Sequence, residues 1–457
     1  MRCTRQMGLV LGWLVAALAA PAAHADMVVN GFTLPGDPAA VVWGINNNGT
    51  LVGSSADASS QWGFVYDGGV VTRLLGPAGS LGASAIGISD TGSVIGSYET
   101  GTPASPLVRS FIYSNGSYLT PDFGLPSSSD IELRGISPDG RYVSGYYQST
   151  DNSRGVGFVY DRGTSQLVHS FDYGAGSTVI PQGINSHGQL VGSIYTPSGN
   201  VSFLYDIGTG QQSTFSFSGA SKVSARAIND QGLIAGWLNQ AGDGSTHAWI
   251  GSAAGFLLLP GLAGQPMVAE GLNNLGQVVG FTTPNDGSNG VSFIASPVVL
   301  PTSSAGGAYT FSTAVVADQP VFIDPLVAIG YAYKIGAGNP LFKTVSLPAG
   351  VGDDRYEIIV GSQHFTVHGN EIFDFTAHGF AAGVDGFTVE GIEPAALLDP
   401  NDPQAFVTRL TFAGSGQFTG TQTALTMDYT APVPEPSSGV MLLAGGALLL
   451  VMRRRRA

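Results

Sequence analysis

Short hydrophobic runs separated by polar, glycine-containing turns recur at nearly constant spacing through the first two thirds of the chain. In the first copy, an apolar run ends in Gly44-Ile45-Asn46, a polar turn follows, and a second apolar run ends at Gly53. The copies start 43 to 48 residues apart, at Gly44, Gly87, Gly135, Gly183, Ala227 and Gly271. A period of this length is typical of one four-stranded β-propeller blade. The pattern therefore predicts six blades.

Each repeat contains two further apolar runs, one of them aromatic, which brings the expected number of strands per repeat to four. The aromatic runs lie at 64–67, 111–113, 158–161, 203–206, 248–250 and 293–295. Because these aromatic residues recur with the repeat, packing between blades explains them better than stacking against sugars, which is the alternative. The glycine that ends each second run, such as Gly53, falls within a strand and indicates a close backbone approach near the axis.

The two ends of the repeat region complement each other. Residues 28–36 resemble the last strand of a repeat that lacks its first three, and the sixth repeat stops after 293–295. An N-terminal strand that pairs into the sixth repeat would close a ring without a large exposed sheet edge. We therefore predict an all-β fold with a six-bladed β-propeller over residues 26–300, closed by an N-terminal strand. A linear solenoid of stacked hairpins is the alternative.

After the repeats the rhythm of the chain changes. A connector rich in Pro, Ser and Gly at 301–308 precedes longer alternating runs between 309 and 430, a length usual for one domain. Long amphipathic helical patterns are absent from the sequence. We predict a separate β-sandwich domain over residues 309–430.

Residues 28–296 resemble the HAF-type extracellular repeats, whose pattern is Gly-Ile-Asn-x-x-Gly-x-x-x-Gly. The departures are Ser89 and Ser137 in place of Asn, Ala227 in place of Gly, Leu272 in place of Ile, and one extra residue before Gly145. These changes are conservative for a turn and a core. The resemblance implies an exported, propeller-like module and no particular chemistry.

The first 25 residues have the pattern of a secretory signal peptide. A basic start precedes an apolar run at 9–20, and an A-x-A cleavage site ends at Ala25. The only cysteine, Cys3, lies within this leader. The mature chain is therefore expected to be exported, with no disulfide and no cysteine-ligated metal.

Residues 431–457 have three parts: Pro434-Glu435-Pro436, an apolar segment at 439–452, and the basic cluster Arg453, Arg454, Arg455 and Arg456. This order is similar to the PEP-CTERM sorting signal, which implies processing by an exosortase in Gram-negative bacteria that make exopolysaccharide. The apolar segment is shorter than the roughly 20 residues that span a membrane, and the arginines resist translocation. We expect transient insertion in the inner membrane, followed by transfer to the cell surface or extracellular matrix. A permanent weak anchor is the alternative.

The charge balance narrows the class of partner. The chain has 18 basic and 32 acidic residues and a formal net charge of -14. Basic residues are concentrated in the leader and the tail, so the exported body is more acidic still. An acidic surface repels phosphate backbones, which excludes nucleic acid. Exopolysaccharide or surface proteins are the expected partners.

One variable residue precedes each copy of Gly-Ile-Asn: Trp43, Ile86, Arg134, Gln182, Arg226 and Glu270. If the first strand of each blade is innermost, these residues recur at one height around the ring. Propeller ligands usually bind at the axis. We therefore predict a ligand patch formed by Trp43, Arg134, Gln182, Arg226 and Glu270. The alternative is that Arg134 or Arg226 only pairs with Glu132 or Glu270.

Metal chemistry has little support in the sequence. His364, His368 and His378 lie near Glu371 and Asp374, but no zinc-binding motif is present, and strand residues four apart are separated by roughly 13 Å. Acidic loops supply oxygen ligands without the spacing of a calcium loop; they lie at 285–287, 353–354 and 399–402. We expect no cofactor, with calcium as the alternative.

Catalytic motifs are equally sparse. The sequence contains no Gly-x-Ser-x-Gly motif and no cysteine outside the leader. We therefore expect a non-catalytic exported surface or matrix protein that binds glycan or protein partners. Glycosidase carboxylates leave no local motif, so a polysaccharide-active hydrolase or lyase with axial acid residues is the alternative.

Overall fold

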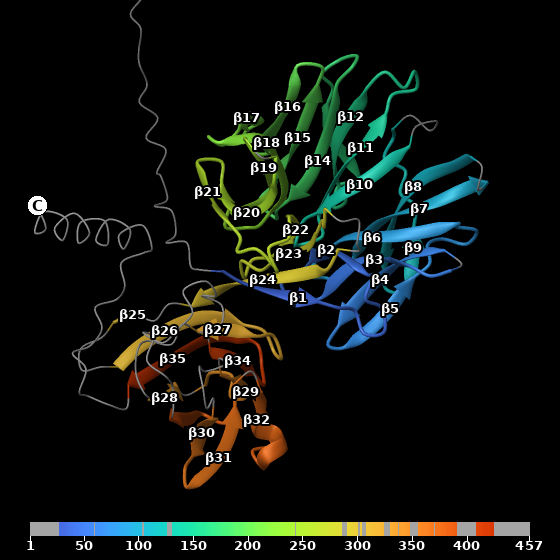
Figure 1. Cartoon of the computed structure of the whole chain (residues 1–457). Coiled ribbons are helices and arrows are strands. Elements are labelled where there is room, and N and C mark those ends of the chain that lie inside the picture. The colour runs from blue at the N-terminus through green and yellow to red at the C-terminus, as the bar shows by residue number, and fades with distance from the viewer. Residues whose placement is uncertain are drawn as a thin grey trace, which may run out of the picture.

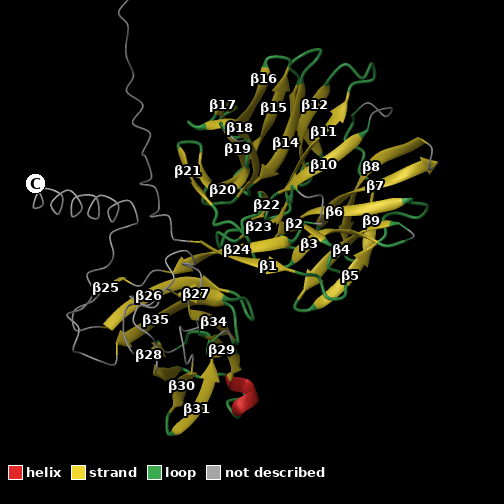
Figure 2. Ribbon diagram, viewed as in Figure 1, coloured by secondary structure: helices red, strands yellow, loops and turns green. Residues whose placement is uncertain are grey.

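The computed structural model describes residues 27–58, 60–102, 105–125, 130–242, 244–285, 290–299, 302–303, 308–323, 330–336, 338–347, 355–369, 371–390 and 408–424. Nearly all regular structure in these ranges is β-strand; the exception is one 3-10 turn, η1 (Phe375–His378), drawn red in Figure 2. The fold is nearly all-β, as the sequence predicts. The predicted leader and sorting tail lie outside the described residues. Within the described part of the chain, no helix has the length and apolar composition to cross a membrane.

Residues 41–258 form five consecutive groups of four antiparallel strands (Figure 1), and a parallel pairing of Gly155 with Thr178 joins the third and fourth groups into one sheet. The first group is β2 (Val41–Ile45), β3 (Leu51–Ala56), β4 (Gln61–Asp67) and β5 (Val70–Leu74). The second is β6 (Gly82–Ile88), β7 (Val94–Thr102), β8 (Ser105–Ser114) and β9 (Ser117–Leu119). The third is β10 (Ile131–Ile136), β11 (Tyr142–Gln148), β12 (Gly155–Asp161) and β13 (Gln166–Phe171). The fourth is β14 (Thr178–Ile184), β15 (Gln189–Thr196), β16 (Gly199–Asp206) and β17 (Gln211–Phe215). The fifth is β18 (Ala220–Ile228), β19 (Ile234–Gln240), β20 (Thr246–Ser252) and β21 (Gly255–Leu258).

A sixth group takes its last strand from the N-terminal segment. β22 (Met267–Leu272), β23 (Val278–Thr282) and β24 (Ser292–Val299) follow one another, and β1 (Met27–Phe32) pairs antiparallel with β24. Met27 and Val29 are buried in the core of this group. The early segment thus lies beside the sixth repeat, because this repeat offers both a free strand edge and an apolar surface to cover.

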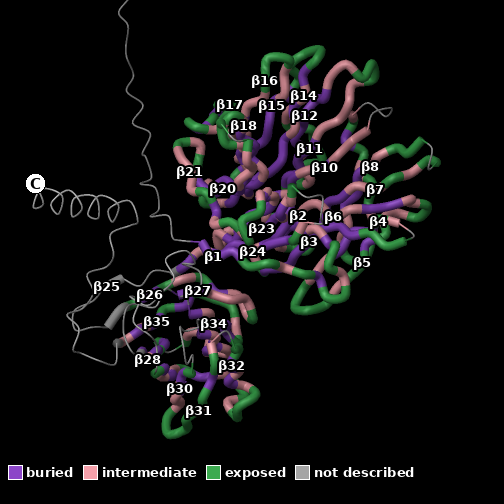
Figure 3. Tube along the Cα trace, in the orientation of Figure 1, coloured by how far each residue is buried: buried purple, intermediate pink, exposed green. Residues whose placement is uncertain are grey.

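The first strands of the six groups form a closed circle, which we call the ring. β2 contacts β6, and the contacts continue through β10, β14 and β18 to β22, which contacts β2 again. Side-chain amides reinforce the circle: Asn46 Nδ2 donates to the carbonyl of Ser89, 3.1 Å away, and Asn185 Nδ2 donates to Asn229, 3.0 Å away. Asn229 Nδ2 in turn donates to Asn273, 3.1 Å away. In Figure 3 buried residues run along the strands of the ring, and the outer loop tips are exposed.

The glycine in the second strand of each group makes room for a carbonyl of the first strand. A Cβ atom on Gly280 would lie 1.9 Å from the Val268 carbonyl oxygen, and at the other five copies the corresponding distance is 2.0 to 2.3 Å. The sequence predicts this close approach near the axis, and that prediction is wrong: it lies inside each group, between its first and second strands. At the ring itself the crowded glycine is that of Gly-Ile-Asn: a Cβ on Gly183 would lie 2.7 Å from the Cα of Ala227.

Strands between residues 302 and 424 form one further sheet and extend the sheet of the sixth group, and both surround an aromatic core. One contains β25 (Thr302–Ser303), β26 (Ala308–Val315), β35 (Gly416–Ala424), β28 (Gly330–Ile335), β33 (Gly386–Glu390), β30 (Arg355–Val360) and β31 (Gln363–His368), in that order. The other contains β27 (Val321–Ile323), β34 (Thr408–Phe412), β29 (Phe342–Ser346) and β32 (Ile372–Asp374). Phe342, Phe412 and Phe418 pack against one another in the core that both sheets share.

The two regions are joined through β24. Its last residues, Val298 and Val299, pair in parallel with Phe322 and Ile323 of β27. Val28, Val298 and Phe322 form a small buried cluster at this junction. The sheet of the sixth group therefore continues into the second region, and the domain boundary near residue 300 stays a prediction.

Candidate functional site

A β-bulge in the first strand of every group places one residue toward the axis of the ring. In β2, Val42 pairs with Gly53 and Gly44 with Val52, so Trp43 is the extra residue. Bulges at the equivalent place in β6, β10, β14, β18 and β22 set apart Ile86, Arg134, Gln182, Arg226 and Glu270. A bulge re-aims a side chain. The six positions singled out in the sequence are thus the six bulge residues.

These bulge residues line one hollow on the axis, which we call the axial cavity. It encloses about 240 Å³ and is completed by Ser84, Ser97 and Glu132. A smaller hollow of about 80 Å³ shares the six bulge residues and is also lined by Asn47 and Asp90. The two hollows therefore form one axial space.

Arg134 and Glu132 form an ion pair on the wall of the axial cavity. Arg134 Nη2 donates to Glu132 Oε2 at 2.5 Å, and Tyr146 Oη donates to Glu132 Oε1 at 2.7 Å. Burial, together with the neighbouring Glu132 carboxylate, raises the pKa of Tyr146 to about 12. Both oxygens of Glu132 are therefore occupied. Arg134 Nε is buried and has no hydrogen-bond partner among the described residues.

Arg226 and Glu270 form a looser pair on the same wall. Arg226 Nε lies 3.6 Å from Glu270 Oε2, and the side chains are 19% and 11% exposed. This separation exceeds the length of a hydrogen bond. Buried Arg226 Nε finds no hydrogen-bond acceptor in the described part of the chain. Burial raises the pKa of Glu270, although the charges of Arg226 and Arg134 oppose the shift.

Trp43 and Gln182 complete the predicted set. Trp43 Nε1 donates to Ser54 Oγ at 2.8 Å, and its ring packs edge-on against Phe281 with 5.3 Å between centroids. Gln182 is buried in the cavity wall. The structure thus brings all five predicted residues together, and it also contains the ion pairs of the alternative interpretation. Ligand binding by these residues stays a prediction.

The sequence analysis did not assign Ser84, Ser97 and Tyr146 to the site, and it considered Glu132 only as an ion-pair partner. Period-two alternation places Ser84 two positions before the bulge residue of its strand. Ser97 and Tyr146 each directly follow a strand glycine. These positions relative to the bulge residue and the strand glycine could have indicated the three residues. Using them requires knowing where the bulge lies, which the sequence does not give.

The histidines of the second region are held by protein partners. His364 Nδ1 lies 2.8 Å from Glu357 Oε1, and His378 Nδ1 lies 2.8 Å from the carbonyl oxygen of Asp374. Among the described residues, no three His, Cys, Asp or Glu side chains converge on one point as metal ligands. Of the candidate calcium positions at 285–287, 353–354 and 399–402, all except residue 285 lie outside the described residues.

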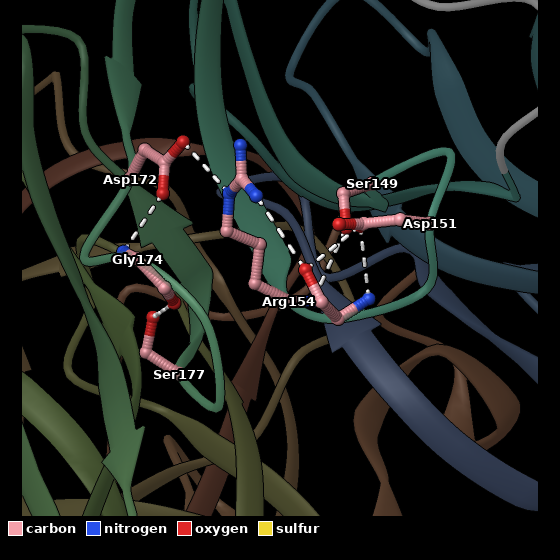
Figure 4. A network of polar contacts seen from close by, with 7 residues as sticks. Ser149, Asp151, Arg154, Asp172, Gly174 and Ser177 are labelled. Carbon is pink, nitrogen blue, oxygen red and sulfur yellow. Dashed lines mark hydrogen bonds and ion pairs between the residues drawn. The ribbon is translucent and has the colours of Figure 1, made fainter.

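A second polar cluster links the loop between β11 and β12 to the segment between β13 and β14, which connects the third group to the fourth (Figure 4). The hydroxyl of Ser149 donates to Asp151 Oδ1 at 2.6 Å, and such hydrogen bonds lower the pKa of Asp151. Arg154 Nε and the amide of Gly174 both donate to Asp172, each at 2.9 Å. Every carboxylate in this cluster has a protein donor, so its role is to hold the two loops together.

Residues 432–456 match the model of the PEP-CTERM protein-sorting motif. The match indicates an exported surface protein with a C-terminal sorting signal and implies processing by an exosortase-type enzyme. It includes the predicted Pro434-Glu435-Pro436 and the arginine cluster. No curated protein matches the chain.

Several solved structures are similar to part of the chain. A prolyl endopeptidase is 11% identical, with 64% of this chain and 45% of that chain covered and a TM-score of 0.37. TolB from Acinetobacter baumannii is 16% identical, with 57% of this chain and 76% of TolB covered and a TM-score of 0.35. The β-propeller domain of the Trilobed protease from Pyrococcus furiosus is 10% identical, with 60% of this chain and 89% of that domain covered and a TM-score of 0.38. The chain thus spans less than half the length of the endopeptidase, and at these TM-scores the similarities assign no function.

Proposed function

We propose that the protein is a non-catalytic component of the cell surface or extracellular matrix that binds exopolysaccharide through its axial cavity. In this proposal the six strand groups are the blades of a six-bladed β-propeller closed by β1, and the second region is a β-sandwich. The closed circle of first strands and the two sheets around one aromatic core support these assignments. The HAF-type resemblance agrees with an exported propeller module.

The observation that carries the binding proposal is the convergence of six bulge residues on one cavity. An aromatic ring, two guanidiniums, an amide and two carboxylates line it within about 240 Å³. A concave site with a few convergent polar groups is the usual form of a small-molecule site. The test is a glycan array probed with the secreted protein and with Trp43→Ala. We expect the secreted protein to bind a sugar on the array and Trp43→Ala to lose that binding. If no sugar is bound, glycan binding is rejected.

An axial hydrolase or lyase is the second candidate, because Glu132 and Glu270 line the same cavity. Burial raises the pKa of Glu270, as a general acid requires. Against this, each oxygen of Glu132 already accepts a hydrogen bond, from Arg134 or from Tyr146, which makes it a weaker base or nucleophile. Release of reducing ends from exopolysaccharide by the wild type, abolished in Glu270→Gln, would establish the enzyme and reject the non-catalytic role.

We further propose that the tail is removed by an exosortase after a pause in the inner membrane, and that the body then reaches the cell surface. The support is the match at residues 432–456. Intact-mass measurement of secreted protein from hosts with and without the exosortase tests this. Loss of the tail only in the first host is expected. A full C-terminus in both hosts would favour the permanent anchor.

A further inference from the structure

The axial cavity contains hydrogen-bond donors that the protein itself does not satisfy. Arg226 Nε and Arg134 Nε are both buried, and neither has a hydrogen-bond acceptor among the described residues. A buried donor without an acceptor is unfavourable, and more so when it carries charge. The two guanidiniums reach the cavity from different strand groups: Arg134 lies on β10 and Arg226 on β18. The side chains of Arg134 and Arg226 are still 29% and 19% exposed, so the cavity meets each guanidinium through its accessible part, and both positive charges act on whatever enters.

The acidic residues of the cavity do not use up these donors. Glu132 binds Arg134 through Nη2, which leaves Nε free. Glu270 stays 3.6 Å from Arg226 Nε, beyond hydrogen-bonding distance. A planar carboxylate is the acceptor that matches a guanidinium best, because it accepts two parallel N–H bonds.

The size and the remaining lining indicate what carries that carboxylate. The cavity, at about 240 Å³, is below the roughly 300–1,000 Å³ of sites for drug-sized ligands, so it suits one small ring and not an extended chain. Ser84, Ser97 and Gln182 add neutral polar groups to the lining, and Trp43 adds an aromatic ring. These are partners for hydroxyls and for the apolar face of a sugar.

We propose that the axial cavity binds a single carboxylate-bearing sugar residue, a uronate, with its carboxylate on Arg226 and Arg134. The proposal rests on the glycan-binding function above and names the glycan class. A site of this size takes a terminal or pendant residue of an acidic polysaccharide. The hydroxyl oxygens of a neutral sugar can accept from an arginine, but they carry no charge and do not offer the paired oxygens of a carboxylate.

The test is calorimetric titration of the secreted protein with glucuronate, glucose and acetate. Glucuronate is expected to bind, and Arg226→Gln and Arg134→Gln are each expected to weaken it about ten- to hundredfold, the range for a lost charge-assisted hydrogen bond. Arg73→Gln is the matched control, because Arg73 is 55% exposed in a surface pair with Asp57, away from the cavity. Unchanged thermal unfolding of each variant shows that it is folded.

A second variant tests the site without removing an arginine. Glu270 is surrounded by Arg226 on β18 and by Arg134 and Glu132 on β10. Glu270→Gln removes a negative charge that repels the ligand, so it is expected to tighten glucuronate binding severalfold at pH 8. Weaker binding in this variant would overturn the proposal.

The other outcomes separate the two levels of the proposal. If glucose binds as tightly as glucuronate and Arg226→Gln has no effect, the preference for a uronate is rejected and glycan binding stands. If acetate binds as tightly as glucuronate, the site recognises a carboxylate without a sugar, and the claim that it binds a sugar residue is rejected. If none of the three binds, the uronate site is rejected, and the glycan array then decides whether glycan binding as such survives.

Discussion

The side-chain amide of Asn273 donates to the main-chain carbonyl of Asn46, 3.1 Å away and 227 residues earlier in the chain. This hydrogen bond joins the last group of the ring to the first. Asn273 Oδ1 also accepts from the amides of Leu275 and Gln277 at 3.1 and 3.0 Å. One buried side chain therefore shapes its own turn and closes the circle.

Replacing Asn273 separates these two roles. Asn273→Ala leaves the Asn46 carbonyl with only the hydrogen bond from Gly49 N and leaves the amides of Leu275 and Gln277 without their side-chain acceptor. It should lower the free energy of unfolding by about 3 kcal/mol. Asn273→Ser should cost only about 1 kcal/mol, because a serine can still accept in the turn, as Ser137 does from Tyr142 N at 2.9 Å. Urea unfolding measures both, with exposed Asn30→Ala as the control. No loss in Asn273→Ser would show that the bond between groups contributes nothing, and equal losses in the two variants would show that the acceptor in the turn contributes nothing.

Removing β1 tests how the ring is closed. A variant that lacks Met27–Phe32 exposes the edge of β24 and removes Met27 and Val29 from their core. We expect it to aggregate, because an unpaired edge recruits other strands. A synthetic peptide of residues 27–36 should restore a soluble monomer, as measured by size-exclusion chromatography. A soluble variant with unchanged thermal unfolding would contradict this role.

A single added methyl group tests the tight packing inside a group. Gly280→Ala would place Cβ 1.9 Å from the Val268 carbonyl oxygen, so the β22–β23 pairing must shift. We expect a loss of at least about 3 kcal/mol, at the upper end of overpacking effects. Gly255→Ala is the control, because a Cβ there has nothing within 4 Å and needs no positive φ; it should change stability by less than about 0.5 kcal/mol. Thermal unfolding distinguishes the two.

The pH dependence of stability follows from carboxylates whose pKa is shifted downward. Hydrogen bonds, chiefly from Ser149, Arg141, Gly174 and Thr376 respectively, lower the pKa values of Asp151, Asp161, Asp172 and Asp374. A lowered folded-state pKa stabilises the fold above the unfolded pKa, near 4, and this stabilisation disappears as the pH falls further. The thermal midpoint should therefore drop below about pH 4. Asp161→Asn should be destabilising at pH 7 and less destabilising at pH 3. A midpoint that is flat down to pH 3 would contradict the assignment.

Glu270 should act in the opposite direction. Its pKa is raised by burial, so the folded state binds the proton more tightly than the unfolded state does. Its contribution therefore grows more favourable as the pH falls from its folded pKa toward about 4. Glu270→Gln, which resembles the protonated form, should raise the thermal midpoint at pH 8 and leave it unchanged near pH 4. A lower midpoint at pH 8 would show that the charge of Glu270 is needed by Arg226.

Local patterns determined the strands of this protein. Alternation, aromatic runs and turn glycines depend on neighbours within a few residues, so the four strands of each repeat could be read from the sequence. The place of β1 also followed, because an unmatched strand at one end and a missing strand at the other leave one favourable pairing. The bulge positions could be singled out as the variable residues before each Gly-Ile-Asn, and Trp43, Arg134, Gln182, Arg226 and Glu270 do converge.

Only the tertiary structure decided what these side chains meet. The bulge that turns Arg226 toward the axis and the hydrogen bond from Tyr146 to Glu132 arise between neighbouring strands of one group, and the 3.6 Å gap between Arg226 and Glu270 arises between two groups. The reason for glycine at Gly280 was also hidden, since the obstructing Val268 carbonyl belongs to another strand. Hydrogen-bond distance and burial depend on atoms brought together from far along the chain, and a one-dimensional pattern carries no information about the last few ångströms between them.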